Sequence, residues 1–309
     1  MPHVEIEGLT KDYPTGSLSL KSKRALDHLD LTIDEGEIFG LIGPNGAGKT
    51  TTIKLLMGLI FPTEGQARIL GKPVGDLTMK SKIGYLPEQP YFYDYLTGRE
   101  LLDYFGQLFG MARTERRQRS EELLRRVDLA AAGDTQLRKY SKGMTQRLAV
   151  AQALLNRPRV VFLDEPMSGL DPMGRREMTM LVRELHDEGV TVLFCSHILA
   201  DVEALCDRVA ILNQGKQVKT GRLGEILDLS LTIEVVLDEV SESLETKLAG
   251  IGKGLQRLAK GVRVELPDEE ALAKVLNLIQ ENGARLVSVS PVKQTLEEYF
   301  VREVARAGV

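Results

Sequence analysis

The residues 37–51 read EIFGLIGPNGAGKTT, and this stretch determines the fold that we expect for the chain. It begins with an apolar run from Ile38 to Ile42, which is typical of a fully buried strand. A glycine-rich turn follows, and the segment from Thr51 to Met57 is expected to form a helix. The turn fits the pattern G-x-x-x-x-G-K-[ST], in the strand-to-helix context in which that pattern binds phosphate. The stretch therefore predicts a nucleotide-binding loop.

The loop carries backbone and side-chain groups that suit a polyphosphate. Glycines let successive N–H groups converge on an anion, and the start of the next helix adds free N–H groups and a partial positive charge. Lys49 is expected to reach the terminal phosphates, and the Thr50 hydroxyl to hold a magnesium ion. The residues expected to contact the nucleotide in this loop are Gly43, Pro44, Asn45, Gly46, Ala47, Gly48, Lys49, Thr50 and Thr51.

Composition and charge exclude several classes of protein. A length of 309 residues predicts about two domains, and 43% hydrophobic with 27% charged residues is ordinary for a globular chain. The net charge of −4 argues against a protein built to bind nucleic acid. The start, MPHVEIEGLTKDY, lacks the features of a signal peptide, and no stretch approaches the ~18 apolar residues needed to cross a bilayer. Cys195 and Cys206 lack metal-ligand spacing and are expected to be thiols of the core.

The order of strand and helix patterns predicts an α/β domain over residues 1–225. Strand signals at Val160–Leu163 and Val190–Cys195 flank a helix expected over Pro172–Glu188, and this spacing implies parallel pairing. Before them, helical spacing of apolar residues predicts a helical subdomain over about residues 90–158.

Two other segments complete the expected organisation. The polar stretch from Tyr13 to Lys23 separates two apolar strand patterns and is expected to be a hairpin loop. Beyond the first domain, short strands and helices predict a small C-terminal α+β domain over residues 226–309, without a catalytic constellation.

Asp164 and Glu165 directly follow the apolar run VVFL. The carboxyl end of a parallel strand emerges beside the phosphate loop, where Asp164 is expected to hold Mg²⁺ directly or through water. Glu165 is placed to act as the general base for a hydrolytic water. The alternative interpretation is that two acidic residues merely open a loop.

Five further motifs stand after the phosphate loop in a fixed order. They are Gln89, the segment YSKGM that starts at Tyr140, LDEP with Asp164 and Glu165, SGLD ending at Asp171, and Ser196-His197. In this order they resemble the ATP-binding-cassette (ABC) family, over residues 1 to about 225. The resemblance implies a P-loop NTPase cassette: a mixed sheet core with a helical subdomain.

The resemblance also implies individual roles. Gln89 would sense Mg²⁺ and the γ-phosphate, which adds it to Thr50 and Asp164 as a metal-site residue. His197 would hold the γ-phosphate and the attacking water, so Glu165, His197 and Gln89 form the expected catalytic set. Tyr13 would stack on adenine.

The signature segment departs from the usual LSGGQ of the family. Ser141 and Gly143 remain, and the resemblance implies that they contact a γ-phosphate. Lys142 replaces the first glycine, and it either adds charge to the phosphate site or is only solvated. Because the signature lies far from the phosphate loop of its own cassette, the resemblance implies that two chains sandwich two nucleotides, with Asp171 at their contact.

YSKGM with an appended domain resembles the ATPase subunits of two-component exporters, in which the membrane part is a separate chain. The implied function is ATP hydrolysis with Mg²⁺ by a subunit that pairs with a second ATPase subunit, expected to be an identical copy. It would drive a permease from the cytoplasmic, inner face of the cell membrane and would not bind nucleic acid. Import cassettes more often keep the glycine pair, so the departure favours export.

Three alternatives stay open from the sequence. Eight of the Tyr and Phe residues lie between Tyr85 and Phe109, and they form either the core of the helical subdomain or a groove for a membrane partner. A soluble ABC ATPase that acts on ribosomes or nucleic acid is the second function considered. A P-loop kinase or GTPase is the third, although no N-K-x-D motif is present.

Overall fold

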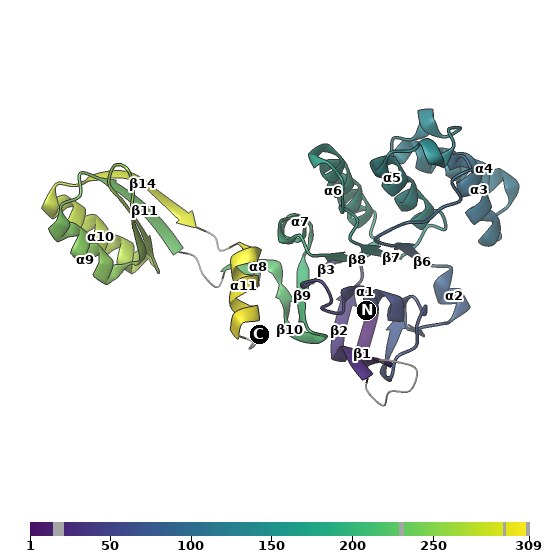
Figure 1. Ribbon diagram of the computed structural model, residues 1–309, viewed down its shortest axis with the longest axis horizontal. Coiled ribbons are helices and arrows are strands. Elements are labelled where there is room, and N and C mark those ends of the chain that lie inside the picture. Colours follow the sequence, from purple (N-terminus) through teal and green to yellow (C-terminus); the bar gives the residue numbers. More distant parts are fainter. Residues whose placement is uncertain (15–21, 229–231, 293–294, 307–309) are drawn as a thin grey trace. The chain divides into compact units, whose positions relative to one another are not determined.

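The computed structural model describes residues 1–14, 22–228, 232–292 and 295–306 (Figure 1). The chain divides into two compact units, Met1–Arg222 and Leu223–Val309. Cys195 and Cys206 are buried free thiols, as expected. Within the described ranges, no helix combines the length and apolar character needed to cross a bilayer.

A six-stranded sheet forms the centre of the first unit, with strand order β10-β9-β3-β8-β7-β6. Every neighbouring pair from β9 to β6 is parallel, and only the edge strand β10 runs antiparallel to β9. The parallel pairing expected for the two strands around residues 160–195 is thus confirmed. The strands are β3 (Ile38–Ile42), β6 (Ile83–Leu86), β7 (Val160–Asp164), β8 (Thr191–Ser196), β9 (Arg208–Asn213) and β10 (Lys216–Arg222).

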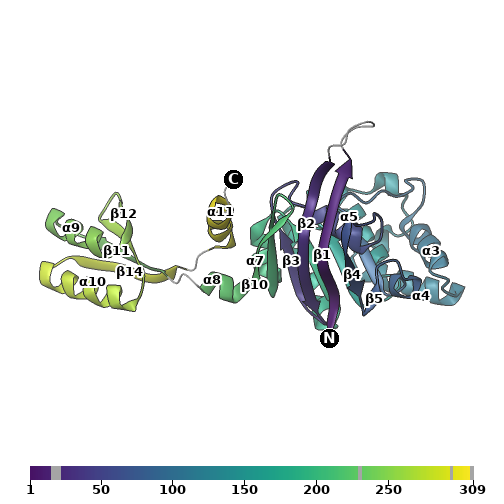
Figure 2. The same ribbon diagram turned by 90° about the horizontal axis from the view of Figure 1, so that it is seen from below.

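A smaller antiparallel sheet has the strand order β2-β1-β4-β5, and its strands can be followed in that order in Figure 2. Helix α1 (Lys49–Leu56) begins two residues earlier than expected, and its apolar residues join those of both sheets in one core. The strands of the smaller sheet are β1 (Pro2–Pro14), β2 (Ser22–Asp34), β4 (Glu64–Ile69) and β5 (Lys72–Pro73).

The prediction of a hairpin loop from Tyr13 to Lys23 is wrong at both ends of the segment. Tyr13 lies in β1 and pairs with Lys23 in β2, so the ladder continues through polar residues. The polar composition led to a wrong prediction because these ends of the two strands are held by ladder hydrogen bonds rather than by apolar burial. Residues 15–21 between them lie outside the described part of the chain.

Helices cover the larger sheet and form a cluster beyond β6 and β7 (Figure 1). A capping box of Thr97 and Glu100 fixes the start of α3, and Asp171 caps α6, which has a proline in its first turn. Besides α1, the helices described in this unit are α2 (Leu77–Lys80), α3 (Gly98–Leu108), α4 (Arg113–Arg126), α5 (Lys142–Ala153), α6 (Pro172–Asp187) and α7 (Leu199–Leu205). Two short 3-10 turns, Ala130–Ala132 and Leu137–Lys139, lie between α4 and α5.

The second unit is an α+β sandwich with one antiparallel sheet, ordered β12-β13-β11-β14. In chain order its central elements follow the pattern βαββαβ, which is the ferredoxin-like arrangement. Apolar residues of α9 and α10 pack on the sheet in a core of their own. The elements are α8 (Leu223–Asp228), β11 (Thr232–Asp238), α9 (Glu242–Ile251), β12 (Lys253–Arg257), β13 (Val262–Leu266), α10 (Glu269–Asn282), β14 (Arg285–Val292) and α11 (Leu296–Arg306).

Gly252 provides a test of this packing. It has an ordinary φ of −100°, yet a Cβ atom there would lie 2.3 Å from Val264 Cγ2 and 2.9 Å from the backbone oxygen of Glu265. Gly252→Ala is therefore expected to destabilise the second unit by about 1–3 kcal/mol, because the core must shift to admit one methyl group. Hydrogen exchange of peptides covering α9 and β13 in the full chain measures the effect.

Gly250→Ala is the matched control, since a Cβ atom there meets nothing within 4 Å. It lies within α9 and should leave protection unchanged or raise it by up to about 1 kcal/mol through helix propensity. Equal protection in both variants would contradict the packing described for Gly252.

Candidate nucleotide-binding and hydrolysis site

Three strand ends create the site. Ile42 pairs with Ser196 and Asp164 pairs with Cys195, so β3, β8 and β7 end at the same edge of the sheet. The segments that follow these strands are the phosphate loop, the His197 turn and the Glu165 turn. A cavity of about 860 Å³ opens at this edge. It is lined by Tyr13, Lys23, Arg24, Ala25, Asn45, Gly46, Ala47, Gly48, Lys49, Thr50, Thr51, Glu88, Glu165, His197 and Gln214.

The phosphate loop needs glycine for conformation and for space. Gly48 caps α1 with a φ of 110°, a region that residues with side chains rarely adopt. A Cβ atom there would also lie 2.8 Å from the backbone oxygen of Ala25. At Gly43 a Cβ atom would lie 2.3 Å from the backbone oxygen of Leu212. The backbone therefore packs too closely for a side chain at Gly43 or Gly48, and a loop of this kind can turn backbone N–H groups toward an anion.

Lys49 is a buried cation that the loop itself satisfies. Its Nζ donates to the backbone oxygen of Gly43 at 2.7 Å and approaches that of Pro44 at 3.4 Å. It also lies 3.7 Å from Glu165 Oε1. A phosphate oxygen is a stronger, charged acceptor than a carbonyl. Lys49 is thus placed to exchange these neutral contacts for an ionic one when a phosphate enters.

Thr50 and Asp164 supply a pair of oxygen donors. The Thr50 hydroxyl donates to Asp164 Oδ1 at 3.4 Å; Thr50 lines the cavity, whereas Asp164 is not among its lining residues. Asp164 is 1% exposed, and its burial raises its pKa to about 6, while the Thr50 hydrogen bond acts in the lowering direction. Mg²⁺ prefers such hard oxygen ligands, a few from the protein and the rest from phosphates and water. The two residues therefore fit the metal that the sequence predicts.

Glu165 and His197 form the second charged group of the cavity. His197 Nδ1 lies 2.8 Å from Glu165 Oε2, which the His197 backbone N–H also approaches at 3.4 Å. Glu165 has a φ of 50°, a strained value for a residue with a side chain and one that clusters at functional sites. Its carboxylate contacts both His197 and Lys49, so the three ionisable side chains are joined in one cluster of the cavity.

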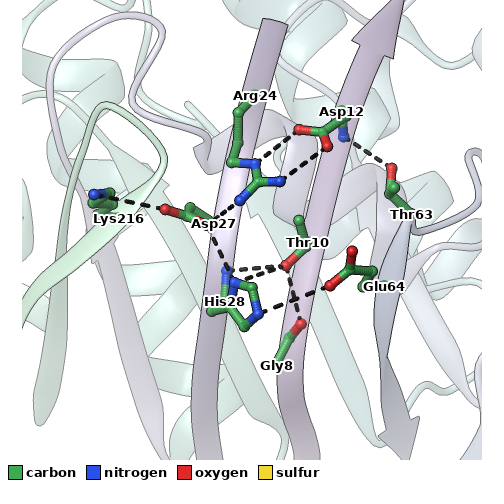
Figure 3. Close-up of polar contacts among 9 residues, drawn as sticks. All are labelled: Gly8, Thr10, Asp12, Arg24, Asp27, His28, Thr63, Glu64 and Lys216. Atoms are coloured by element: carbon green, nitrogen blue, oxygen red, sulfur yellow. Dashed lines mark hydrogen bonds and ion pairs between the residues drawn. The ribbon is translucent and has the colours of Figure 1, made fainter. Parts of the chain in front are cut away.

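Tyr13 stands at the rim of the cavity, beside Arg24 on the neighbouring strand. Asp12 fixes the Arg24 guanidinium with two hydrogen bonds of 2.9 and 3.2 Å, and Asp27 adds one of 2.8 Å (Figure 3). These hydrogen bonds hold the pKa of Arg24 above its usual value, Asp12 contributing most. Lys216 in turn approaches Asp27 at 3.7 Å. The network fixes the strand pair that carries Tyr13 to the rim.

The structure separates the remaining predicted residues from this cavity. Gln89 is exposed and does not line it, whereas the adjacent Glu88 does, so the role of Gln89 stays a prediction. Ser141, Gly143 and Asp171 come together in a second cavity of about 410 Å³, which shares no lining residue with the first.

Five residues that line the first cavity were not expected from the sequence: Lys23, Arg24, Ala25, Glu88 and Gln214. Lys23 and Arg24 are consecutive basic residues at the end of the supposed loop, and that pair was an available signal for an anion site. Gln214 turns between β9 and β10 with a φ of 48°, and only the pairing of the strands brings it to the cavity.

Comparisons with known proteins agree with this geometry. The sequence profile of the family described as ABC transporter matches residues 26–168. An uncharacterised ABC transporter ATP-binding protein of Synechocystis sp. is 44% identical over 312 residues, which cover 99% of this chain and 86% of that protein. A daunorubicin resistance ATP-binding protein of Streptomyces coeruleorubidus is 34% identical over 305 residues, covering 96% of this chain and 94% of that protein.

One solved structure with the same fold is a dimeric ATP-binding cassette in a post-hydrolysis state, bound to ADP and Pi. It is 29% identical and superposes with a TM-score of 0.65, covering 71% of this chain and 98% of that one. The chain therefore belongs to the ABC transporter ATP-binding family and is a P-loop ATPase cassette of that family.

Proposed function

We propose that this chain is the ATPase subunit of an exporter, which pairs with an identical copy and drives a separate permease at the inner face of the cell membrane. One observation carries the proposal: the phosphate loop and the signature residues line separate cavities of the same unit. Export is supported by the name of the Streptomyces relative, which describes drug resistance. The net charge of −4 disfavours a soluble cassette acting on nucleic acid.

The first cavity would bind ATP with its phosphates on the loop. Lys49 would leave the Gly43 carbonyl for the phosphates, and Thr50 with Asp164 would hold Mg²⁺. The metal, when bound, neutralises charge on the phosphates. Glu165 would accept a proton from the attacking water, and His197 would orient that water and the γ-phosphate.

The second cavity would complete the site of another chain. Ser141 caps α5 and Asp171 caps α6, so both present helix starts at the cavity. Helix starts bind anions, but this cavity has no phosphate loop of its own. A γ-phosphate would reach Ser141 and Gly143 if a second chain brings it. Two chains would then close on two nucleotides and separate after hydrolysis.

A groove of about 400 Å³ would receive the permease. Tyr91 on its wall is 94% exposed, and the aromatic side chains of Phe92, Phe105 and Phe109 also line it. Tyr85 and Pro90 line this groove, while Glu88 between them lines the nucleotide cavity. A helix of the membrane partner seated here would therefore touch the same short segment that the nucleotide touches.

The proposal is tested by isolating the full chain together with its membrane partner. Co-purification with a polytopic membrane protein, and stimulation of ATPase activity by it, is the expected result. Co-sedimentation with ribosomes instead would favour the soluble alternative.

Glu165→Gln should reduce ATP turnover by about 10²–10⁴-fold, because the amide cannot accept the proton of the attacking water. ATP binding should be preserved, since Lys49 and the loop are unchanged. Steady-state hydrolysis and equilibrium nucleotide binding measure the two effects. The matched control is Glu115→Gln on the exposed side of α4, which should hydrolyse normally. Undiminished hydrolysis in Glu165→Gln would remove Glu165 from this role.

Binding of Mg²⁺ should weaken as the pH falls below about 6. The raised pKa of Asp164, about 6, means that the carboxyl takes up a proton there, and a metal ion must then displace it. Affinity should drop about tenfold per pH unit below 6 and level off above 7. Titration of Mg²⁺ in the presence of ATP between pH 5 and 8 measures this.

Asp164→Asn serves as the control, because the nucleotide itself titrates equally in both proteins. The difference between the two pH curves belongs to Asp164. Curves of identical shape and position would exclude Asp164 as a ligand.

Tyr91→Ala should weaken association with the permease by about tenfold or more while leaving basal ATP hydrolysis unchanged, since an exposed aromatic anchor is lost. Phe61→Ala is the control, because Phe61 is 84% exposed but does not line the groove. Association is measured by pull-down of the permease with each variant. If Tyr91→Ala binds as well as the parent and Phe61→Ala, the groove is not the docking site.

A further inference from the structure

Gln146 carries a buried amide that the hydrolysis proposed above does not use. It lies in α5, is 3% exposed, and its Nε2 donates to the backbone oxygen of Pro166 at 3.0 Å. Pro166 is buried as well. A buried amide or carbonyl is costly unless it is hydrogen-bonded, and this contact satisfies one group of each kind. The bond therefore joins α5 to the segment that follows β7.

That segment starts with an unusual backbone conformation. Glu165, directly before Pro166, has a φ of 50°, whereas a residue before proline favours extended backbone with a negative φ. Such a conformation persists only where its surroundings fix it. The Glu165 N–H donates to the Cys195 oxygen at 2.9 Å, and the Glu165 oxygen accepts the Ser168 N–H at 3.0 Å. Gln146 adds a bond from a separate helix, and of these three bonds it is the one that a side-chain substitution can remove.

The backbone at Glu165 decides where its carboxylate lies. Oε2 is 2.8 Å from His197 Nδ1, and Oε1 is 3.7 Å from Lys49 Nζ. A general base must come within hydrogen-bond reach of the proton that it accepts, and a displacement of about 1 Å can cost about a hundredfold in rate. Gln146 does not line the nucleotide cavity, so it bears on hydrolysis through this turn and not by contact with ATP.

We propose that Gln146 is a positioning residue for ATP hydrolysis, which holds the turn formed by Glu165 and Pro166 and thereby sets the Glu165 carboxylate for proton transfer. This role rests on the proposed function of Glu165 as the general base. It also joins the helix capped by Ser141 to the hydrolytic turn of the same chain. A merely structural amide would stabilise the fold, whereas a positioning amide also sets the rate of the chemical step.

Gln146→Met in the full chain tests this role. Methionine is similar in length and helix propensity but cannot donate to the Pro166 carbonyl. The kcat for ATP hydrolysis with Mg²⁺ should fall by about tenfold to a hundredfold, because the carboxylate is no longer held in place. The KM and the Kd for ATP should stay within about twofold of the parent values, because the phosphate loop is unchanged. Steady-state kinetics and equilibrium nucleotide binding measure these effects.

Two variants accompany the methionine variant. Gln118→Met makes the same replacement on the exposed side of α4 and should hydrolyse ATP like the parent. Gln146→Asn keeps a buried amide but is one methylene shorter, so it should not reach Pro166 and should lose kcat in the same way. It takes the place of Gln146→Met in every measurement if the methionine variant does not bind ATP with the parent affinity.

A double-mutant cycle with Glu165→Gln separates positioning from general destabilisation. If Gln146 acts through the Glu165 carboxylate, its loss has no further effect once that carboxylate is gone. Gln146→Met should therefore change the residual single-turnover hydrolysis of Glu165→Gln by less than about twofold.

Three results would overturn the inference while the proposed function of Glu165 stands. The first is undiminished kcat in a Gln146 variant that binds ATP normally. The second is an equal loss of hydrolysis in the parent and Glu165→Gln backgrounds. The third is loss of ATP binding in both Gln146 variants, which would make Gln146 a structural residue of the fold. If Glu165→Gln itself hydrolyses ATP at the parent rate, the proposed function of Glu165 fails and the role of Gln146 falls with it.

Discussion

The parallel pairing of β3, β8 and β7 is the constraint on which the site depends. Each of these strands is buried along its whole length, because helices or the second sheet cover both faces of the sheet. Side chains alternate between faces, so a slip of one residue would turn every one of them to the wrong side. The register therefore has little freedom. This register places three segments at the carboxyl edge of the sheet: the loop with Lys49, the pair Asp164 and Glu165, and His197.

That edge concentrates buried charge. Lys49, Asp164 and Glu165 are at most 7% exposed, and such groups are stable only when they are paired or coordinated. Each of the three groups has such a compensation. Lys49 donates to a backbone carbonyl, the pKa of Asp164 is raised by burial, and Glu165 contacts the ring of His197. These contacts are substitutes that a nucleotide and a metal ion could replace with stronger ones. The folded cavity is thus prepared for its ligand before the ligand arrives.

The sequence was most informative where one physical cause dominates. Buried parallel strands such as Val160–Leu163 show as continuous apolar runs, and the helix that begins at Pro172 shows its cap and proline directly. Elements held by tertiary pairing were missed. The strand β12, KGLQR, has no alternating pattern, and only its ladder with β13 makes it a strand. The place of Arg24 at the cavity was missed for the same reason, because the pairing of β1 with β2 extends beyond the apolar residues of both strands. Local pattern carries no information about such partners.

The phosphate loop and the signature residues line different cavities of the first unit, and this separation has a consequence for control. In the proposed arrangement, a chain whose phosphate loop binds ATP by itself, but whose signature lies elsewhere, would gain its remaining γ-phosphate contacts only through association. A ligand shifts an equilibrium only by its difference in affinity for the two states. Contacts made solely in the proposed closed pair, such as those of Ser141 and Gly143, would supply that difference, whereas the contacts of Lys49 within one chain would not. The segment around Glu88 adds a second input, since it borders both the nucleotide cavity and the aromatic groove. Closure driven by ATP and occupancy of the groove would then act on one short stretch of chain, and energy released in one could be used in the other.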